Sequence, residues 1–179
     1  MDVLREALVM FWLVLVFEFA IEGVRAVDNV ALSCPTRQSS VLFGGTSDRA
    51  NDGNIDGYYS DNSCTFTAAL DYPWWAVDLG SERLVRSVII YNRVDEQPER
   101  LRDLRVGMMD TWPTGNNSLL VMDAICATRD GPHPEARLII PCEKNATGRY
   151  LVIQLAAVKV TLTLCEVEVF VQCKYIDVL

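Results

Sequence analysis

The sequence predicts an all-β fold, an antiparallel β-sandwich of the jelly-roll type, on three observations. Beyond position 26, apolar residues occur in short runs rich in Val, Ile, Tyr and Trp, and clusters of Gly, Pro, Asn and Asp separate these runs. Such runs and clusters are typical of strands and turns. No segment after position 26 sustains a helical period, so no helices are expected to cover a parallel sheet. Many short strands in about 150 residues therefore favour an antiparallel sandwich.

The first element is an apolar segment that we do not count as part of this domain. Its uninterrupted apolar run covers residues 7–17, and Glu18 and Glu22 follow it closely. The run is shorter than the ~20 apolar residues that a membrane-spanning helix needs, which disfavours a retained anchor. We therefore expect a signal peptide over residues 1–26, with cleavage after Ala26. Small residues offer alternative cleavage sites at Ala20 and Gly23.

The remaining residues, 27–179, are expected to form one domain, because they contain no linker, internal repeat or low-complexity tract. The whole chain carries a net charge of −8 and has no cluster of Lys and Arg. An acidic surface of this kind argues against nucleic acid or an anionic membrane as a partner.

Six apolar runs are the expected strands of this domain. In the last run, Val167, Val169 and Val171 share one face with two cysteines, and Glu166 and Glu168 share the other. This alternation indicates a strand with one buried face. The runs are Trp74–Leu79, Leu84–Asn92, Leu104–Met108, Arg137–Ile140, Tyr150–Leu155 and Cys165–Gln172.

Cysteines and glycosylation motifs indicate a secreted, extracellular glycoprotein. All six cysteines lie beyond position 26, none in a CxxC spacing, and an even number in an exported chain is typical of disulfides. Sequons at Asn116 and Asn145 agree with passage through the secretory pathway. Six cysteines allow about 15 pairings, so the sequence alone leaves the connectivity open. The cysteines are Cys34, Cys64, Cys126, Cys142, Cys165 and Cys173.

Five stretches, in order and spread over nearly the whole domain, resemble the F-type lectin (fucolectin) domain. That family is related to the discoidin and coagulation-factor type C domains. The resemblance implies a calcium-stabilised jelly roll that recognises terminal fucose on glycans and serves innate immunity. The stretches are Asn29-Val30-Ala31-Leu32-Ser33, Asn51-Asp52-Gly53-Asn54, Ser63-Cys64-Thr65, Pro73-Trp74-Trp75 with Val77-Asp78-Leu79-Gly80, and Leu164-Cys165-Glu166-Val167-Glu168-Val169.

The family's sugar motif is a His followed at fixed spacing by Arg-x-Asp and then by Arg or Lys. Arg93, Asp95 and Arg100 match its second half, whereas Phe66 stands at the position of the His. The resemblance implies that the two arginines donate hydrogen bonds to sugar oxygens and that Asp95 orients them. Phe66 and Tyr59 would pack against the deoxy-sugar methyl group and ring.

Two departures from the motif keep a second interpretation open. Replacing His by Phe66 deletes a donor, at a cost of about 1 to 3 kcal/mol of binding free energy. In addition, Glu96 and Gln97 stand where family members often have adjacent cysteines. The arginines would then form only surface ion pairs with Asp95, Glu96 and Glu99, and Phe66 would only anchor a loop. The alternative is a degenerate lectin-like domain that binds a protein partner or self-assembles into a homo-oligomer.

The resemblance also implies a structural Ca²⁺ site and two disulfides. Oxygen-rich loops of this type suit a hard cation. The implied disulfides are Cys64–Cys165 and Cys126–Cys142, which leaves Cys34 and Cys173 as a third pair. The implied Ca²⁺ ligands are the carbonyls of Arg49, Ser63 and Cys165 and the side chains of Asp52, Asn54 and Glu166.

An enzyme is not expected. The single histidine, His133, lies between prolines in an expected exposed turn, with no nucleophile motif nearby. No pair of carboxylates has a spacing that suggests glycosidase chemistry. Membrane insertion is not expected either.

Overall fold

The computed structural model describes residues 28–115 and 117–172. The expected signal peptide, residues 1–26, therefore lies outside the described residues, as do Asn116 and Cys173. Within the described ranges, no helix is long and apolar enough to cross a membrane.

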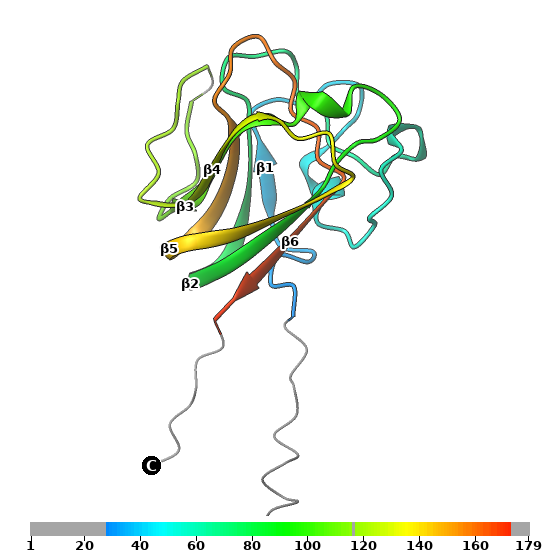
Figure 1. The fold of residues 1–179 in the computed structure, drawn as a ribbon. Coiled ribbons are helices and arrows are strands. Elements are labelled where there is room, and N and C mark those ends of the chain that lie inside the picture. Colours follow the sequence, from blue (N-terminus) through cyan, green and yellow to red (C-terminus); the bar gives the residue numbers. More distant parts are fainter. Residues whose placement is uncertain (1–27, 116, 173–179) are drawn as a thin grey trace, which may run out of the picture.

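The domain is built from antiparallel strands in the order β1-β2-β5-β3-β4, with β6 paired to β2 (Figure 1). The long strands β2 and β5 run through both layers of a sandwich. Their Trp74–Asp78 and Tyr150–Gln154 parts pair with each other and lie with β1 and β3, whereas the other ends of β2 and β5 lie with β6. The strands are β1 Thr36–Gln38, β2 Trp74–Tyr91, β3 Arg102–Met109, β4 Ala124–Pro132, β5 Arg137–Leu155 and β6 Glu166–Val171.

The all-β prediction is confirmed, but some of the expected strand boundaries were wrong. The runs 74–79 and 84–92 are one continuous strand, and so are 137–140 and 150–155. Gly80, with φ +77°, lies in a register shift of β2 between Asp78 and Arg83. Gly80 and Ser81, which lie between the two expected strands, therefore belong to a bulge, which lets the strand bend from one layer into the other. Strands β1 and β4 were missed.

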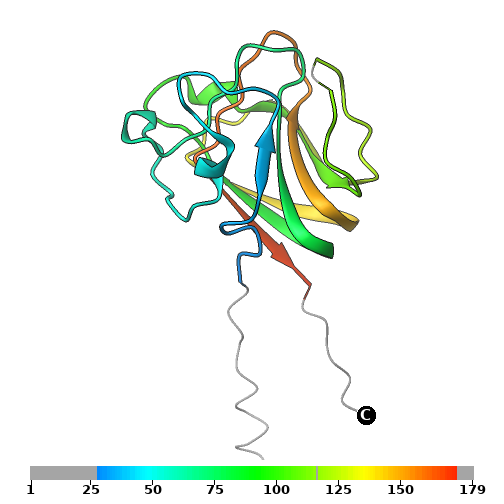
Figure 2. The same cartoon turned by 180° about the vertical axis from the view of Figure 1, so that it is seen from behind.

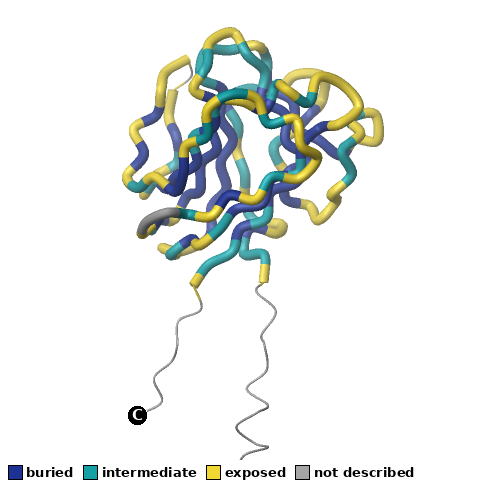
Figure 3. The backbone as a smooth tube through the Cα atoms, in the orientation of Figure 1, coloured by how far each residue is buried: buried dark blue, intermediate teal, exposed yellow. Residues whose placement is uncertain are grey.

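The hydrophobic core lies between the two layers, and Figure 3 shows that the buried stretches of the strands gather there. Trp75 faces this core and is fully buried, and Trp74 faces the other side of the same sheet, under Leu120 and Met122. Both tryptophans are thus packing residues, in agreement with the alternation of side chains along a strand. Helical structure among the described residues is confined to the short 3₁₀ turns η1 Ser47–Ala50, η2 Tyr59–Asp61 and η3 Pro98–Arg100.

Both disulfides implied by the resemblance are present. Cys126 of β4 bonds to Cys142 of β5, and Cys64 bonds to Cys165 just before β6. Cys34 forms no disulfide with a described residue. Its expected partner, Cys173, lies outside the described residues.

The segment before β1 and the end of β6 lie side by side at one edge of the molecule, as Figures 1 and 2 show. The Val30 amide donates to the Val169 carbonyl at 2.9 Å, which ties the two segments together. Long loops gather at the other end of the sandwich, and the motif residues lie there.

Candidate functional site

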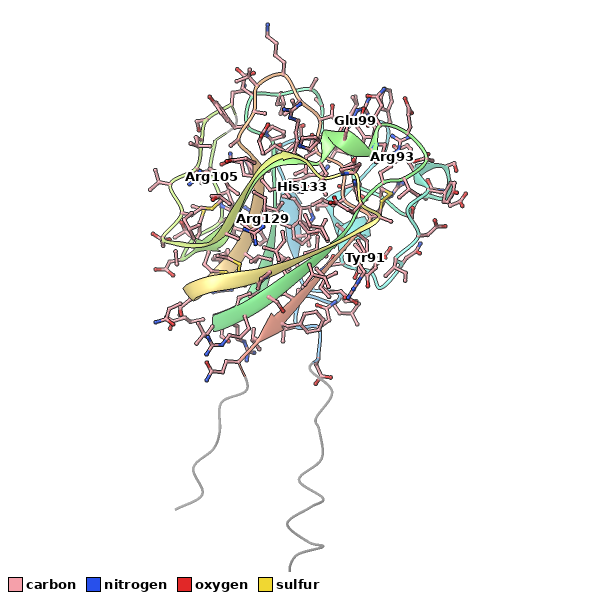
Figure 4. The ribbon with its side chains drawn as sticks, viewed as in Figure 1. Tyr91, Arg93, Glu99, Arg105, Arg129 and His133 are labelled. Carbon is pink, nitrogen blue, oxygen red and sulfur yellow. A yellow bond between two sulfur atoms is a disulfide. The ribbon has the colours of Figure 1, made fainter. Side chains whose placement is uncertain are left out.

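The expected site residues come from two connections, β1–β2 and β2–β3, at the end of the sandwich where β2 terminates. Arg93 follows β2, Arg100 closes η3, and Tyr59 begins η2. Figure 4 shows Arg93 and Glu99 near η3, on the end away from the chain termini. The fold therefore brings residues 59, 66, 93 and 100 into one place.

An aromatic cluster forms the centre of the site. The ring of Phe66 meets the rings of Phe43 and Tyr59 edge-to-face, each at a centroid distance of 5.3 Å. Phe66 is only 8% exposed, whereas Phe43 is 74% exposed. Phe66 is thus both the anchor of the loop and the floor of the site, and the exposed aromatic surface belongs to Phe43.

The loop that carries Phe43 is held tightly against Phe66. The Phe66 amide donates to the Gly45 carbonyl at 3.0 Å, and a Cβ on Gly45 would lie 2.4 Å from that amide nitrogen. Only Gly therefore permits this approach. Phe43 has φ +50°, and the Tyr59 hydroxyl donates to its carbonyl at 2.6 Å. No sequence signal marked Phe43, because its place depends on this loop conformation.

Arg93 is buried, and the N–H groups along one edge of its guanidinium are all hydrogen-bonded. Its Nε donates to Asp95 Oδ1 at 2.6 Å, and its Nη2 donates to Asp95 Oδ2 at 3.1 Å and Glu96 Oε2 at 3.0 Å. The guanidinium lies 4.9 Å from the ring centroid of Tyr59 and 5.9 Å from that of Phe66. The hydrogen bonds from Arg93 lower the pKa of Asp95, and those same bonds raise the pKa of Arg93.

Arg100 differs from Arg93 in that its side chain makes no ion pair with any described residue. Its guanidinium lies 5.8 Å from the centroid of the Phe66 ring. The buried Asn92 amide donates to the carbonyls of Pro98 and His133, at 2.9 and 3.1 Å, which fixes the η3 turn and so Arg100. Asn92 is a second positioning residue that the sequence did not reveal.

The alternative interpretation, in which both arginines form only surface ion pairs, therefore holds in part for Arg93 and does not hold for Arg100. Arg93 pairs with Asp95 and Glu96 as that interpretation expects. Arg100 instead points to Phe66, the residue that also contacts Arg93. Two guanidinium groups converging on one aromatic floor form a directional array of hydrogen-bond donors.

The expected calcium site includes a buried carboxylate, Glu166 of β6, that lacks a full set of hydrogen-bond donors. Glu166 was expected on the solvated face of the last strand, which was wrong, because it is fully buried. Its Oε2 accepts from the Gly53 amide at 3.3 Å, while Oε1 is buried without a hydrogen bond in the described structure. Burial, with Asp52 nearby, raises the pKa of Glu166 to about 7. A buried oxygen without a donor is a natural cation ligand.

The other expected calcium ligands lie on segments linked to Glu166. The Gly53 contact brings the loop of Asp52 and Asn54 to Glu166. The Cys64–Cys165 disulfide brings the neighbourhood of Ser63 there too, and Arg49 Nη1 donates to the Cys64 carbonyl at 3.3 Å. In the described part of the chain, no three Asp, Glu, His or Cys side chains cluster as a metal site. A cation here would therefore depend on carbonyl and amide oxygens as well.

His133 and Asn145 are two polar residues that the sequence predicted to lie in an exposed turn and to carry a glycan, respectively. The two flanking prolines of His133 are exposed as expected, but the His133 side chain is only 15% exposed, with Nδ1 4.0 Å from Glu135, so the expected solvated histidine was wrong. Its backbone amide donates to the Leu101 carbonyl at 2.7 Å, which explains the burial. Asn145 lies exposed in β5, a placement that an attached glycan would tolerate.

The comparisons with known proteins agree with this fold. Residues 49–153 match the F5/F8 type C family described as the NedA-like, galactose-binding domain. The chain is 34% identical to fucolectin-6 of Anguilla japonica over 147 residues, which is 79% of this chain and 75% of that protein. These findings first define the class, a β-sandwich binding domain of the galactose-binding type.

Solved structures narrow the class. A histidine mutant of the lectin domain of lectinolysin, complexed with Lewis b, superposes with a TM-score of 0.72 at 32% identity, over 83% of this chain and 99% of that one. An F-lectin from Morone saxatilis serum gives a TM-score of 0.72 at 31% identity, over 80% of this chain and 48% of that one. The chain belongs to the fucolectin family of lectins. Its relatives are binding domains, which confirms the expectation that it is not an enzyme.

Proposed function

We propose that the protein is a secreted lectin that recognises terminal fucose on glycans. The observation that carries the proposal is the convergence of Arg93 and Arg100 on the ring of Phe66, at 5.9 and 5.8 Å. Membership of the fucolectin family supports it.

The chemistry of the site suits a deoxy-sugar. Fucose offers hydroxyl and ring oxygens that accept hydrogen bonds, and guanidinium groups supply donors in a fixed plane. Its methyl group and apolar ring face need an aromatic partner. Tyr59 lies against Arg93, and Phe43 lies against Phe66, so the two rings offer that surface.

Binding by one site is expected to be weak. Phe66 donates no hydrogen bond where the family's motif has His, a loss of about 1 kcal/mol or more. Several sites engaging one surface would raise avidity by ~10² or more without any new contact. We therefore place the function in multivalent recognition of fucosylated glycans, in innate immunity.

The test is a titration of the folded protein with L-fucose and a glycan array, comparing the wild type with Arg100→Ala. Arg100→Ala should abolish detectable binding. Arg102→Ala is the matched control, because Arg102 is a nearby exposed arginine that pairs with Asp103 and contacts no aromatic ring in the described structure. Folded protein that binds no fucosylated glycan on the array would contradict the proposal.

One observation favours a second candidate, the degenerate domain that engages a protein or itself. Phe66 and Arg93 are only 8% and 5% exposed, so much of the motif is covered. If the protein binds no glycan on the array and forms a defined oligomer in analytical ultracentrifugation, this candidate is favoured.

Calcium as a structural cofactor is part of the proposal. The buried Glu166 Oε1 without a hydrogen-bond donor supports it. The ion would be held by the carbonyls of Arg49, Ser63 and Cys165 and by the side chains of Asp52, Asn54 and Glu166. Its role would be to fix the loops that carry Tyr59 and Phe66.

Secretion rests on the leader and on the relatives. The apolar prefix followed by six cysteines supports export, and one F-lectin relative comes from serum. Expression from the native leader should release the protein into the medium with its N-terminus at Val27. Removal of N-glycans should reduce its mass if Asn116 or Asn145 is modified; protein retained in cells would contradict secretion.

A further inference from the structure

The guanidinium of Arg93 has little room left for a ligand. Asp95 occupies Nε and one hydrogen of Nη2, and Glu96 occupies the other hydrogen of Nη2. The rings of Tyr59 and Phe66 lie within cation–π distance of it. Only Nη1 makes no hydrogen bond to a described residue, and the side chain is 6% exposed.

The partners of Arg93 differ greatly in how firmly they are held. Asp95 binds it through two oxygens and is itself 21% exposed, and the Phe66 ring is packed between Phe43 and Tyr59. Glu96 binds it through one oxygen and is 58% exposed. Its second oxygen accepts only a longer hydrogen bond from Gln97, at 3.3 Å.

Displacing these partners therefore has very different costs. Moving Asp95 breaks a bidentate charge-assisted pair, and moving Phe66 opens a packed cluster. The Arg93–Glu96 contact is the weaker one, because the exposed Glu96 carboxylate is screened by solvent and must give up side-chain entropy to hold the contact. Glu96 is the one contact that can leave Arg93 cheaply.

We propose that Glu96 caps Arg93 in the free protein and competes with the sugar for the Nη2 donor, so that ligand entry requires the Glu96 side chain to swing away. This inference rests on the proposed function only for the identity of the ligand. The cap itself is a property of the free protein.

The cap gives the two arginines different roles. Arg100 has no carboxylate partner among the described residues and is ready to meet a ligand oxygen at once. The Nη2 donor of Arg93 becomes available only when Glu96 is displaced. Glu96 thereby lowers affinity for a neutral sugar, whose hydroxyl must replace a carboxylate at a cationic donor.

The experiment compares Glu96→Ala with a matched control, Glu99→Ala. Glu99 is also an exposed carboxylate in the same loop, at η3, but makes no ion pair with Arg93. Both variants remove one negative charge from this loop, so a difference between them reports the contact and not the general field. Two readouts are measured: L-fucose affinity by calorimetry, and the rate at which phenylglyoxal modifies Arg93, followed by peptide mass spectrometry.

Glu96→Ala should bind L-fucose about two- to fivefold more tightly than the wild type, and its Arg93 should be modified several-fold faster. Glu99→Ala should match the wild type in both measurements. Weaker fucose binding by Glu96→Ala would overturn the cap, because Glu96 would then be a partner of the sugar. Unchanged labelling of Arg93 would overturn it as well. Faster labelling without fucose binding in any variant would support the cap and refute the fucose proposal.

Discussion

Phe66 is the residue on which the proposed sugar recognition depends most. It takes the place of a donor in the family's motif, yet it contacts both arginines and two further rings. The cluster therefore keeps the geometry of a binding site while lacking one hydrogen bond. At this position, packing against the neighbouring rings favours Phe, whereas the sugar motif of the family favours His.

Phe66→His should raise affinity for L-fucose about tenfold, since one additional hydrogen bond contributes roughly 1 kcal/mol or somewhat more. The same change should lower the free energy of unfolding by about 1 kcal/mol, because edge-to-face contacts with Phe43 and Tyr59 are lost. Calorimetry and urea unfolding measure the two effects. Phe66→Leu is the control, which should lose stability without gaining affinity; equal affinities for all three proteins would show that this surface serves another partner.

Asp95 orients Arg93, and its effect should depend on pH in a defined direction. The hydrogen bonds from Arg93 lower the pKa of Asp95 below its usual value. Its contribution to stability is therefore complete above the unfolded-state pKa of about 3.9 and is lost as pH falls through the lower folded-state pKa. Asp95→Asn should be less stable than the wild type by about 1 kcal/mol at pH 6, and this difference should shrink in urea unfolding at pH 3. A difference that is the same at both pH values would refute this account.

Only part of the site could be predicted from residue identities. Arg93, Asp95 and Arg100 were recognised as one site because they match the family's motif, whereas their spacing alone favoured surface ion pairs. Phe43 reaches the site because residues 42 and 45 hydrogen-bond to Phe66, and Asn92 acts through the carbonyls of Pro98 and His133. Such contacts between separate loops leave no periodic trace in the sequence.

At the scale of elements, composition predicted strands but not their continuity. Turn-forming residues near Gly80 resemble the end of a strand, whereas β2 continues through a bulge and changes layer. The choice between a turn and a bulge depends on the partner strand β5, which is far away in sequence. Local pattern therefore predicted the positions of β2, β3, β5 and β6 but missed β1 and β4, and it did not predict the lengths of β2 and β5.

The Cys126–Cys142 disulfide joins β4 of one layer to the part of β5 that lies in the other. Replacing both cysteines by Ala should lower the free energy of unfolding by about 3 kcal/mol, because a short closed loop no longer restricts the unfolded chain. Urea unfolding measures this loss. Fucose affinity should stay unchanged, since neither cysteine contacts the aromatic cluster; unaltered stability would mean that the link between layers is redundant.

At the scale of the whole molecule, the loops of the site depend on the last strand. Glu166, the first residue of β6, accepts a hydrogen bond from Gly53, and Cys165 bonds to Cys64, two residues before Phe66. Strand alternation predicted that Glu166 lies on a solvated face, because this pattern contains no information about loops that cover that face of the strand. Glu166 is buried, and one of its carboxylate oxygens has no hydrogen-bond donor in the described structure. This carboxylate links β6 to the loops of the site.

Calcium should stabilise the whole domain through this carboxylate. An ion that binds only the folded state adds RT ln(1 + [Ca²⁺]/Kd), about 2.7 kcal/mol at a hundredfold excess over Kd. Calorimetric unfolding of the wild type should therefore shift to higher temperature with Ca²⁺ and return with EDTA. Glu166→Gln should lose this shift and yet be at least as stable as the wild type in EDTA, because an unpaired buried charge has been removed.

Glu168→Gln is the matched control for this prediction, since Glu168 lies on the same strand but is only partly buried and faces the Tyr91 hydroxyl at 3.4 Å. It should keep the full response to Ca²⁺. If Glu166→Gln responds to Ca²⁺ as the wild type does, the ion is bound elsewhere. If the wild type shows no response, the buried carboxylate is not a calcium ligand. A selective loss in Glu166→Gln alone would instead mean that the last strand holds the sugar-binding loops in place through a metal ion.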